Sequence, residues 1–232
     1  KSLPISLASG VSQINLVVGR QISSLFDGAI VWLIYADRLA QLPIALIGVA
    51  LNVVSLPKLS SLKDSGRLAE GNSYLNQSMQ LSVIFSIPAT LGLIYLNSEI
   101  IEFLFQRGNF LAHDTIQTSM ALSIYSLSII PISLQMLLLN FYFAEKNIRI
   151  PFYYSLASVF LNVSLAYTLL DTFGFLAPPI AYGITNWLVF ISLVYHTYRF
   201  GFYFNSAFKQ ALPRIVLCSC LMLILLILMK SF

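Results

Sequence analysis

Long apolar stretches alternate with short polar breaks along the whole chain. A helix needs roughly 20 mostly apolar residues to cross a bilayer. Seven stretches meet this requirement, at about 8–27, 29–56, 75–98, 116–143, 151–171, 175–197 and 211–229. Pro43, Pro88 and Pro131 fall inside these stretches, and membrane helices tolerate such prolines better than soluble helices do. The pattern therefore predicts seven transmembrane helices.

The composition supports an all-α, polytopic membrane protein. Hydrophobic residues make up 58% of the chain and charged residues only 9%, whereas a soluble domain carries about 25% charged residues. Cys218 and Cys220 lie two residues apart in the last apolar stretch. Side chains at this spacing point to different faces of a helix, so no disulfide is expected. The chain starts at Lys1, shows no signal-peptide pattern and is expected to be part of a longer protein.

Basic residues gather in every second break between the apolar stretches. One side carries nine of the 13 lysines and arginines: Lys1, Lys58, Lys63, Arg67, Lys146, Arg149, Arg199, Lys209 and Arg214. The positive-inside rule makes this side cytoplasmic, so the first and seventh helices run outward. The net charge of +4 follows from this sorting, and no basic–aromatic stripe indicates a nucleic-acid partner. The break Lys58–Asn72 is long enough for a short surface helix.

Arg20 and Arg38 are charged residues inside predicted spans. An arginine at the bilayer centre costs about 3 kcal/mol, so it normally faces a protein interior or a wet cavity. At about 100° per residue, polar residues share one arc of each of the first two helices. The first arc holds Ser9, Gln13, Arg20, Ser24 and Asp27; the second holds Arg38, Gln41 and Asn52, with Asp37 and Gly48 at its edges. The two arcs predict a hydrated cavity with cationic walls.

Two interpretations of these arginines stay open at this point. Asp37 with Arg38, or Asp27 with Arg20, could only neutralise charge within a structural bundle. Alternatively, a guanidinium fork suits a phosphate or diphosphate ligand. Weaker polar faces occur on later helices, where hydroxyl groups more often form interhelical hydrogen bonds than ligand contacts. These faces hold Asn162 with Ser155 and Ser158, and Thr185 with Ser192 and His196.

Enzyme chemistry finds little support in the sequence. The best candidate set lies in an external stretch and could perform acid–base work; it holds Glu99, Glu102, Arg107, His113 and Asp114. The first two lie on a helix end, and nothing fixes them near His113. The two histidines, His113 and His196, are expected at opposite membrane faces, so they cannot share a metal. The sequence also shows no phosphate-binding glycine loop, and no cofactor is predicted.

One segment of the sequence is specific enough to indicate a family. The run Trp32–Leu51, followed by Leu56–Ser60, closely resembles the signature of the MurJ (MviN) family of bacterial lipid II flippases. Supporting matches occur in the same order along nearly the whole chain, at Val11–Leu16, Phe103–Phe110, Phe143–Asn147, Pro151 and Trp187.

This resemblance implies a fourteen-helix exporter fold of the multidrug/oligosaccharidyl-lipid/polysaccharide type, with two six-helix lobes and two added helices. Residues 1–200 would form the second lobe, and residues 201–232 a cytoplasmic linker with one further helix. The implied activity is alternating-access transport of lipid II from the cytoplasmic to the periplasmic leaflet of the inner membrane. The implied partners are lipid II, membrane lipids and the N-terminal lobe. Another exporter of this superfamily and a non-transporting membrane scaffold remain alternatives.

The resemblance also implies roles for single residues. Asp37 and Arg38 match a cavity-facing acidic–basic pair, with Arg38 expected at the pyrophosphate or nearby head group and Asp37 expected to orient or neutralise it. Arg20, Gln41 and Gln13 complete the expected head-group set. Some relatives bind sodium between their later helices. Asn162 matches one sodium ligand, but Ala166 and Tyr182 stand where an acid and a threonine are expected, which argues against a complete sodium site.

Overall fold

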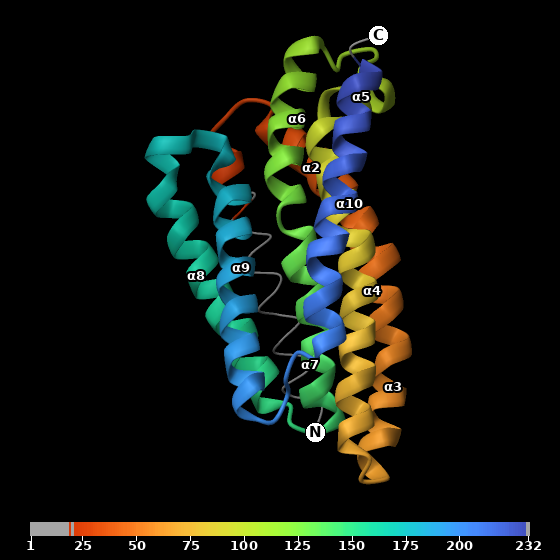
Figure 1. The fold of residues 1–232 in the computed structure, drawn as a ribbon. Coiled ribbons are helices and arrows are strands. Elements are labelled where there is room, and N and C mark those ends of the chain that lie inside the picture. Colours follow the sequence, from red (N-terminus) through yellow and green to blue (C-terminus); the bar gives the residue numbers. More distant parts are fainter. Residues whose placement is uncertain (1–18, 20, 231–232) are drawn as a thin grey trace.

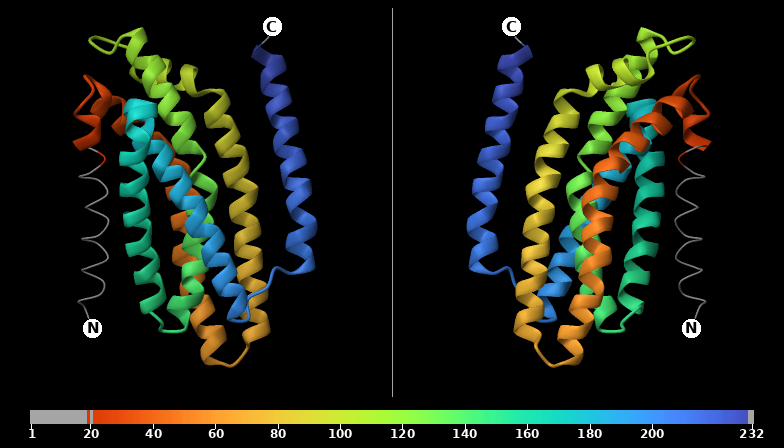
Figure 2. Two further views of the ribbon diagram at one scale, coloured as in Figure 1. Left: turned by 90° about the vertical axis from the view of Figure 1, so that its left-hand side faces the viewer. Right: turned by 90° about the vertical axis from the view of Figure 1, so that its right-hand side faces the viewer.

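The computed structural model describes residue 19 and residues 21–230, and this part of the chain is helical without any β-strand. The described helices form an elongated bundle in which the long helices lie side by side (Figures 1 and 2). The elements are α2 (Ala29–Pro43), π-helix η1 (Ile44–Val49), α3 (Ala50–Asp64), α4 (Leu68–Tyr95), α5 (Asn97–Phe105), α6 (Ala112–Ser126), α7 (Ile129–Ala144), α8 (Arg149–Phe173), 3-10 helix η2 (Gly174–Leu176), α9 (Ala177–Arg199) and α10 (Ser206–Lys230).

Membrane-spanning length is confirmed for six of the seven predicted stretches. Five helical segments are long and apolar enough to cross a membrane, and one of them, Arg149–Arg199, contains two spans because α8 and α9 run antiparallel (Figure 1). Of the first stretch, the described residues 19 and 21–23 are helical. Ser24 and Asp27 lie in the following turn, so this helix ends earlier than predicted. Its other residues lie outside the described part.

Pro131 divides the predicted span 116–143 into α6 and α7. A proline has no backbone N–H and clashes with the carbonyl four residues earlier, which opens the helix there. That carbonyl belongs to Leu127, which lies between the two helices. It accepts a hydrogen bond from the indole nitrogen of Trp187 on α9 at 3.1 Å. The break therefore leaves no orphan carbonyl and ties α9 to the α6–α7 junction.

Small hydroxyl residues line the buried face of α4. Ser78, Ser82, Ser86 and Thr90 recur every four residues and are all nearly inaccessible to solvent. Small side chains at this spacing let neighbouring membrane helices approach closely. The Ser55 hydroxyl of α3 reaches that of Ser78 at 3.2 Å. Close packing of α4 supports the larger apolar core, which lies between α3, α4, α7 and α9.

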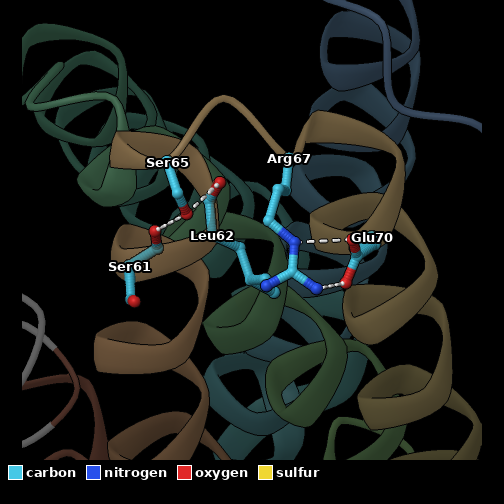
Figure 3. A network of polar contacts seen from close by, with 5 residues as sticks. All are labelled: Ser61, Leu62, Ser65, Arg67 and Glu70. Atoms are coloured by element: carbon cyan, nitrogen blue, oxygen red, sulfur yellow. Dashed lines mark hydrogen bonds and ion pairs between the residues drawn. The ribbon is translucent and has the colours of Figure 1, made fainter.

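The connections α3–α4, α7–α8 and α9–α10 lie at one end of the bundle (Figure 2). The described basic residues that the sequence places on one side lie in these connections or in the adjoining parts of the helices, so this sorting of charge is confirmed for the described residues. The expected surface helix between Lys58 and Asn72 is wrong: α3 runs on to Asp64 and α4 begins at Leu68. A tight turn joins them, with Ser65 donating to the Ser61 carbonyl and Arg67 paired with Glu70 (Figure 3).

All three helices that end there finish in the same way. The N–H of Arg67 bonds the Leu62 carbonyl and the N–H of Gly66 bonds that of Lys63, which is the Schellman arrangement. The same pair of bonds closes α7 and α9. The residue in the left-handed conformation is Gly66 (φ +72°), Lys146 (φ +57°) or Gly201 (φ +93°). This position favours glycine because a Cβ atom is strained there.

Two ion pairs tie the α3–α4 and α7–α8 connections together. Lys63 pairs with Glu145, and the Lys146 ammonium lies 3.7 Å from an Asp64 carboxylate oxygen. Since the second pair is well exposed, its contribution to stability is small. The hydrogen-bonded helix ends therefore matter more for the shape of this end than the ion pairs do.

Exchanging residues at the left-handed positions should change stability in opposite directions. Gly66→Ala meets no neighbouring atoms, so it should destabilise the protein by backbone strain alone, about 1 kcal/mol. Lys146→Gly should raise the melting temperature because it removes the same strain at the end of α7. Thermal unfolding of the purified protein in one detergent measures both. A Gly66→Ala variant as stable as the parent would contradict the strained geometry.

Candidate functional site

A cavity of about 590 Å³ opens on one side of α2. Its walls come from α2, α8 and α9, with Tyr125 of α6 and the described segment before α2. The polar lining residues are Ser23, Asp37, Arg38, Gln41, Tyr125, Ser155, Ser158, Asn162 and Tyr182. Around them lie mostly apolar residues: Gly19, Ile30, Leu33, Ile34, Val159 and Pro178. The structure thus contains a polar cavity within helices of membrane-spanning length.

The structure brings together the candidate residues that lie in its described part. Asp37, Arg38 and Gln41 project from successive turns of α2, and Asn162 faces them from α8 with Ser155 and Ser158. Arg20 and Gln13 lie outside the described residues. Periodicity placed the α2 residues on a cavity, whereas the position of the α8 residues on the same cavity comes from the structure alone, and the roles of all of them stay predictions.

The predicted arc on the second helix is wrong beyond Pro43. Asn52 does not line the cavity; its carbonyl accepts a hydrogen bond from the Asn140 amide of α7 at 3.1 Å. Gly48 also packs on α7, where an added Cβ would lie 3.2 Å from the Ser133 hydroxyl. The cause is η1, because a π-helix has more residues per turn than an α-helix. Its wider turn shifts the helical phase between Gln41 and Asn52.

Asp37 is held by Gln41 rather than by its neighbour. The Gln41 amide donates a hydrogen bond to one Asp37 carboxylate oxygen. Ion pairs among the described residues involve other groups, and Arg38 forms none with any residue that the structure describes. Arg38 therefore lines the cavity without a salt bridge to a described residue, although its charge acts on the neighbouring Asp37 carboxylate.

Two tyrosines of the cavity were not predicted from the sequence as site residues. Tyr125 and Tyr182 face each other edge to face, with ring centroids 5.9 Å apart. The backbone carbonyl of Tyr182 accepts a hydrogen bond from the Asn186 side-chain amide. The backbone carbonyl of Asn186 in turn accepts one from the side-chain amide of Gln135 on α7. Tyr125 belongs to no polar periodic pattern, so only the fold reveals it. Tyr182 was singled out only as a departure from a sodium-binding pattern.

The environment of Ala166 bears on that sodium pattern. Ala166 is buried in an apolar cluster with Ile22 and Ala181, where it supplies no oxygen ligand. Asn162 lies one turn earlier on α8 and faces the cavity. Within residues 19 and 21–230, no group of three or more histidine, cysteine or acidic side chains could hold a metal.

The polar face of α9 is used mainly for contacts between helices. The Tyr142 hydroxyl lies 3.3 Å from His196 Nδ1 and 2.9 Å from the Thr197 hydroxyl. The Tyr154 hydroxyl donates a hydrogen bond to the backbone carbonyl of Ser192 at 3.1 Å. The Ser192 and His196 contacts fit the expectation that this face joins helices, whereas the buried Thr185 hydroxyl has no hydrogen-bond partner among the described residues.

The external acidic residues are engaged in structural contacts. Glu99 and Glu102 lie on α5, a separate short helix rather than the end of the preceding span. Lys230, at the end of α10, pairs with Glu99 and lowers the pKa of its carboxyl by donating a hydrogen bond. His113 contacts Trp32 near the start of α6, whereas His196 lies near the end of α9. The two histidines thus lie at opposite ends of the bundle, as predicted.

The fold and the cavity define a polytopic α-helical membrane protein of the kind that forms a lobe of a transporter. A family model described as "Lipid II flippase MurJ" matches residues 1–232. The chain belongs to this family.

Relatives and a solved structure agree with this assignment. A "Probable lipid II flippase MurJ" from Rickettsia prowazekii is 29% identical over 99% of this chain, and one from Rhizobium meliloti is 31% identical over 95% of it. The solved structure "Lipid II flippase MurJ, inward closed conformation" has a TM-score of 0.87, 28% identity and 98% coverage of this chain. The chain spans 45%, 42% and 47% of these proteins, which is less than half of each.

Thiol labelling should distinguish the cavity from the lipid-facing surface. In a background with Cys218→Ser and Cys220→Ser, Ile34→Cys should react with a water-soluble methanethiosulfonate because Ile34 lines the cavity. Leu46→Cys should react at least about tenfold more slowly in membranes, since lipid excludes ionised reagents, although Leu46 is 77% exposed on the bundle. Equal rates at the two positions would show that the cavity is not hydrated.

Proposed function

We propose that the chain forms the second lobe of a lipid II flippase, and that Arg38 binds the diphosphate of the lipid-linked precursor in the cavity. The observation that carries this proposal is the Arg38 guanidinium on α2, which faces a polar cavity among membrane-spanning helices and forms no salt bridge with a described residue. An arginine is costly at this depth unless water or an anion compensates it. A diphosphate offers several oxygens to the guanidinium fork, and such charge-assisted bonds are strong.

The neighbouring residues prepare Arg38 for this ligand. Gln41 donates to one Asp37 carboxylate oxygen, which reduces the competition of this carboxylate with the head group for the Arg38 guanidinium. Asn162, Ser155 and Ser158 face the cavity from α8 and supply neutral hydrogen-bonding groups for the sugars. The apolar polyprenyl tail stays in the bilayer outside the cavity. No covalent bond is made or broken.

The orientation follows from the basic end of the bundle. The positive-inside rule places the α3–α4, α7–α8 and α9–α10 connections in the cytoplasm of a bacterial cell, with the helices in the inner membrane. Residues 1–200 act as one lobe that rocks against an N-terminal lobe, as in transporters built from repeats. Residues 201–232 supply the linker and a further helix; the described part of that helix, α10, packs along α4 (Figure 2). Membrane lipids surround the assembly.

Removing the guanidinium should abolish transport. The gene encoding this chain, with any adjoining coding sequence, is expressed in a bacterium depleted of its own lipid II flippase. Arg38→Ala and Arg38→Lys should both fail to restore growth, because losing a charged hydrogen bond costs about 1.5–3 kcal/mol and a lysine cannot bind two oxygens in parallel. Plating efficiency and membrane levels of each variant are measured together.

Arg67→Gln is the matched control for these variants. It also removes a guanidinium, but from an exposed pair in the α3–α4 turn, and should restore growth fully. Full rescue by well-expressed Arg38→Ala would overturn the assignment of Arg38. Failure of the normally inserted parent protein would overturn the flippase function itself.

The Gln41–Asp37 bond makes a separate prediction. Gln41→Leu releases the Asp37 carboxylate to pair with Arg38, so transport should fall about tenfold, the effect of one charged hydrogen bond. Adding Asp37→Asn to Gln41→Leu should restore most activity because the competing charge is gone. Rates of precursor exposure at the outer face are compared in the parent, both single variants and the double variant. A double variant no better than Gln41→Leu would contradict competition for Arg38.

A further inference from the structure

A partly buried hydrogen bond joins α2 to α6 at the end of the bundle opposite the basic connections. The Trp32 indole nitrogen donates to one carboxylate oxygen of Asp114 at 2.8 Å. Trp32 is only 8% exposed, and Asp114 lies in the first turn of α6. The bond links residues 82 positions apart. It is therefore a direct tie between the helix that carries Arg38 and a neighbouring helix.

Asp114 is a rigid acceptor because both of its oxygens are used. Its second oxygen accepts the backbone N–H of Leu111 at 2.7 Å, which caps the start of α6. A carboxylate can accept from two N–H donors in this way, whereas an asparagine amide has a single acceptor oxygen. The requirement at this position is thus for an acidic residue and for more than helix capping.

The backbone around Trp32 is shaped to receive its ring. Gly28 has φ +84°, and a Cβ atom there would lie 2.7 Å from Trp32 Cζ2. The ring also meets His113 and Phe175 edge to face, with centroids 5.5 and 5.3 Å away. The start of α2, the first turn of α6 and the α8–α9 turn thus all converge on one side chain.

The tie has a geometric consequence for the cavity. Trp32 and Arg38 are six residues apart on one helix, so they point about 120° from each other around its axis. Fixing Trp32 against α6 therefore fixes the direction of Arg38 toward the cavity. Apolar contacts also hold α2 in place, through Leu33, Ala36, Leu39 and Ala40, and the Trp32–Asp114 bond adds the directional contact. Without this bond, we expect a small rotation of α2 that brings Leu42, which is 57% exposed and does not line the cavity, toward the cavity.

We propose that Trp32 and Asp114 are positioning residues that set the rotation of α2 and hence aim Arg38 into the cavity. Their role in transport rests on the proposed function, but their effect on the helix does not. Neither residue touches the cavity lining itself, so they act through α2 alone.

The test compares cavity and lipid-facing thiols on α2. In the background without Cys218 and Cys220, Ile34→Cys and Leu42→Cys are labelled separately with a water-soluble methanethiosulfonate in membranes. Trp32→Phe keeps an aromatic ring and loses the donor; Asp114→Asn keeps one acceptor oxygen. In both variants the ratio of labelling at position 34 to that at position 42 should fall at least about threefold, because α2 then rotates slightly.

Trp187→Phe is the matched control, since it also deletes one indole donor, the one bonded to the Leu127 carbonyl of the α6–α7 junction. Its labelling ratio should match that of the parent. A ratio unchanged in both Trp32→Phe and Asp114→Asn, with a melting temperature lowered as in Trp187→Phe, would show that the bond only stabilises the fold and would overturn the proposal. Labelling requires no substrate, so a changed ratio in a protein that does not transport lipid II would overturn the proposed function and leave the positioning role standing.

Discussion

The Arg38 guanidinium, set in a helix of membrane-spanning length and in no salt bridge with a described residue, constrains everything around it. Hydrocarbon cannot solvate Arg38, so the protein must keep polar groups and water beside it. The cavity meets this demand with hydroxyl and amide groups from α8 and tyrosines from α6 and α9. The apolar clusters lie behind α2, between it and α6. Burial on one face and hydration on the other give α2 its two-sided character.

The spans could be predicted because the length of an apolar run is a strong physical signal. Their ends were less predictable, since hydrogen bonds between distant segments decide them. Leu127 leaves the helix because Pro131 follows four residues later, and the indole of Trp187 makes the break tolerable. The turn after Asp64 depends on Gly66 adopting a left-handed conformation. Neither the helix break at Leu127 nor the turn at Gly66 can be detected from the hydrophobicity of the sequence.

The site was predictable only where regular helical geometry held. Asp37, Arg38 and Gln41 precede the π-helix, so a repeat of about 100° per residue placed them correctly. Asn52 follows it and was misplaced. Tyr125 was invisible to this reasoning because its neighbours on α6 form no polar arc; it enters the cavity through the packing of α6 against α2. Whether these residues bind a head group is a chemical question that spacing alone does not answer.

The π-helix Ile44–Val49 also divides one long span into two parts with separate rotational settings. A π-turn holds one more residue than an α-turn, so it works as a built-in insertion. Converting this segment to α-helix with its number of residues unchanged would turn everything after it by about 100°. Ser55 and Leu59 would then leave their buried places against α4 and α7. The wide turn is thus needed because the number of residues in this segment sets the direction of every side chain of α3.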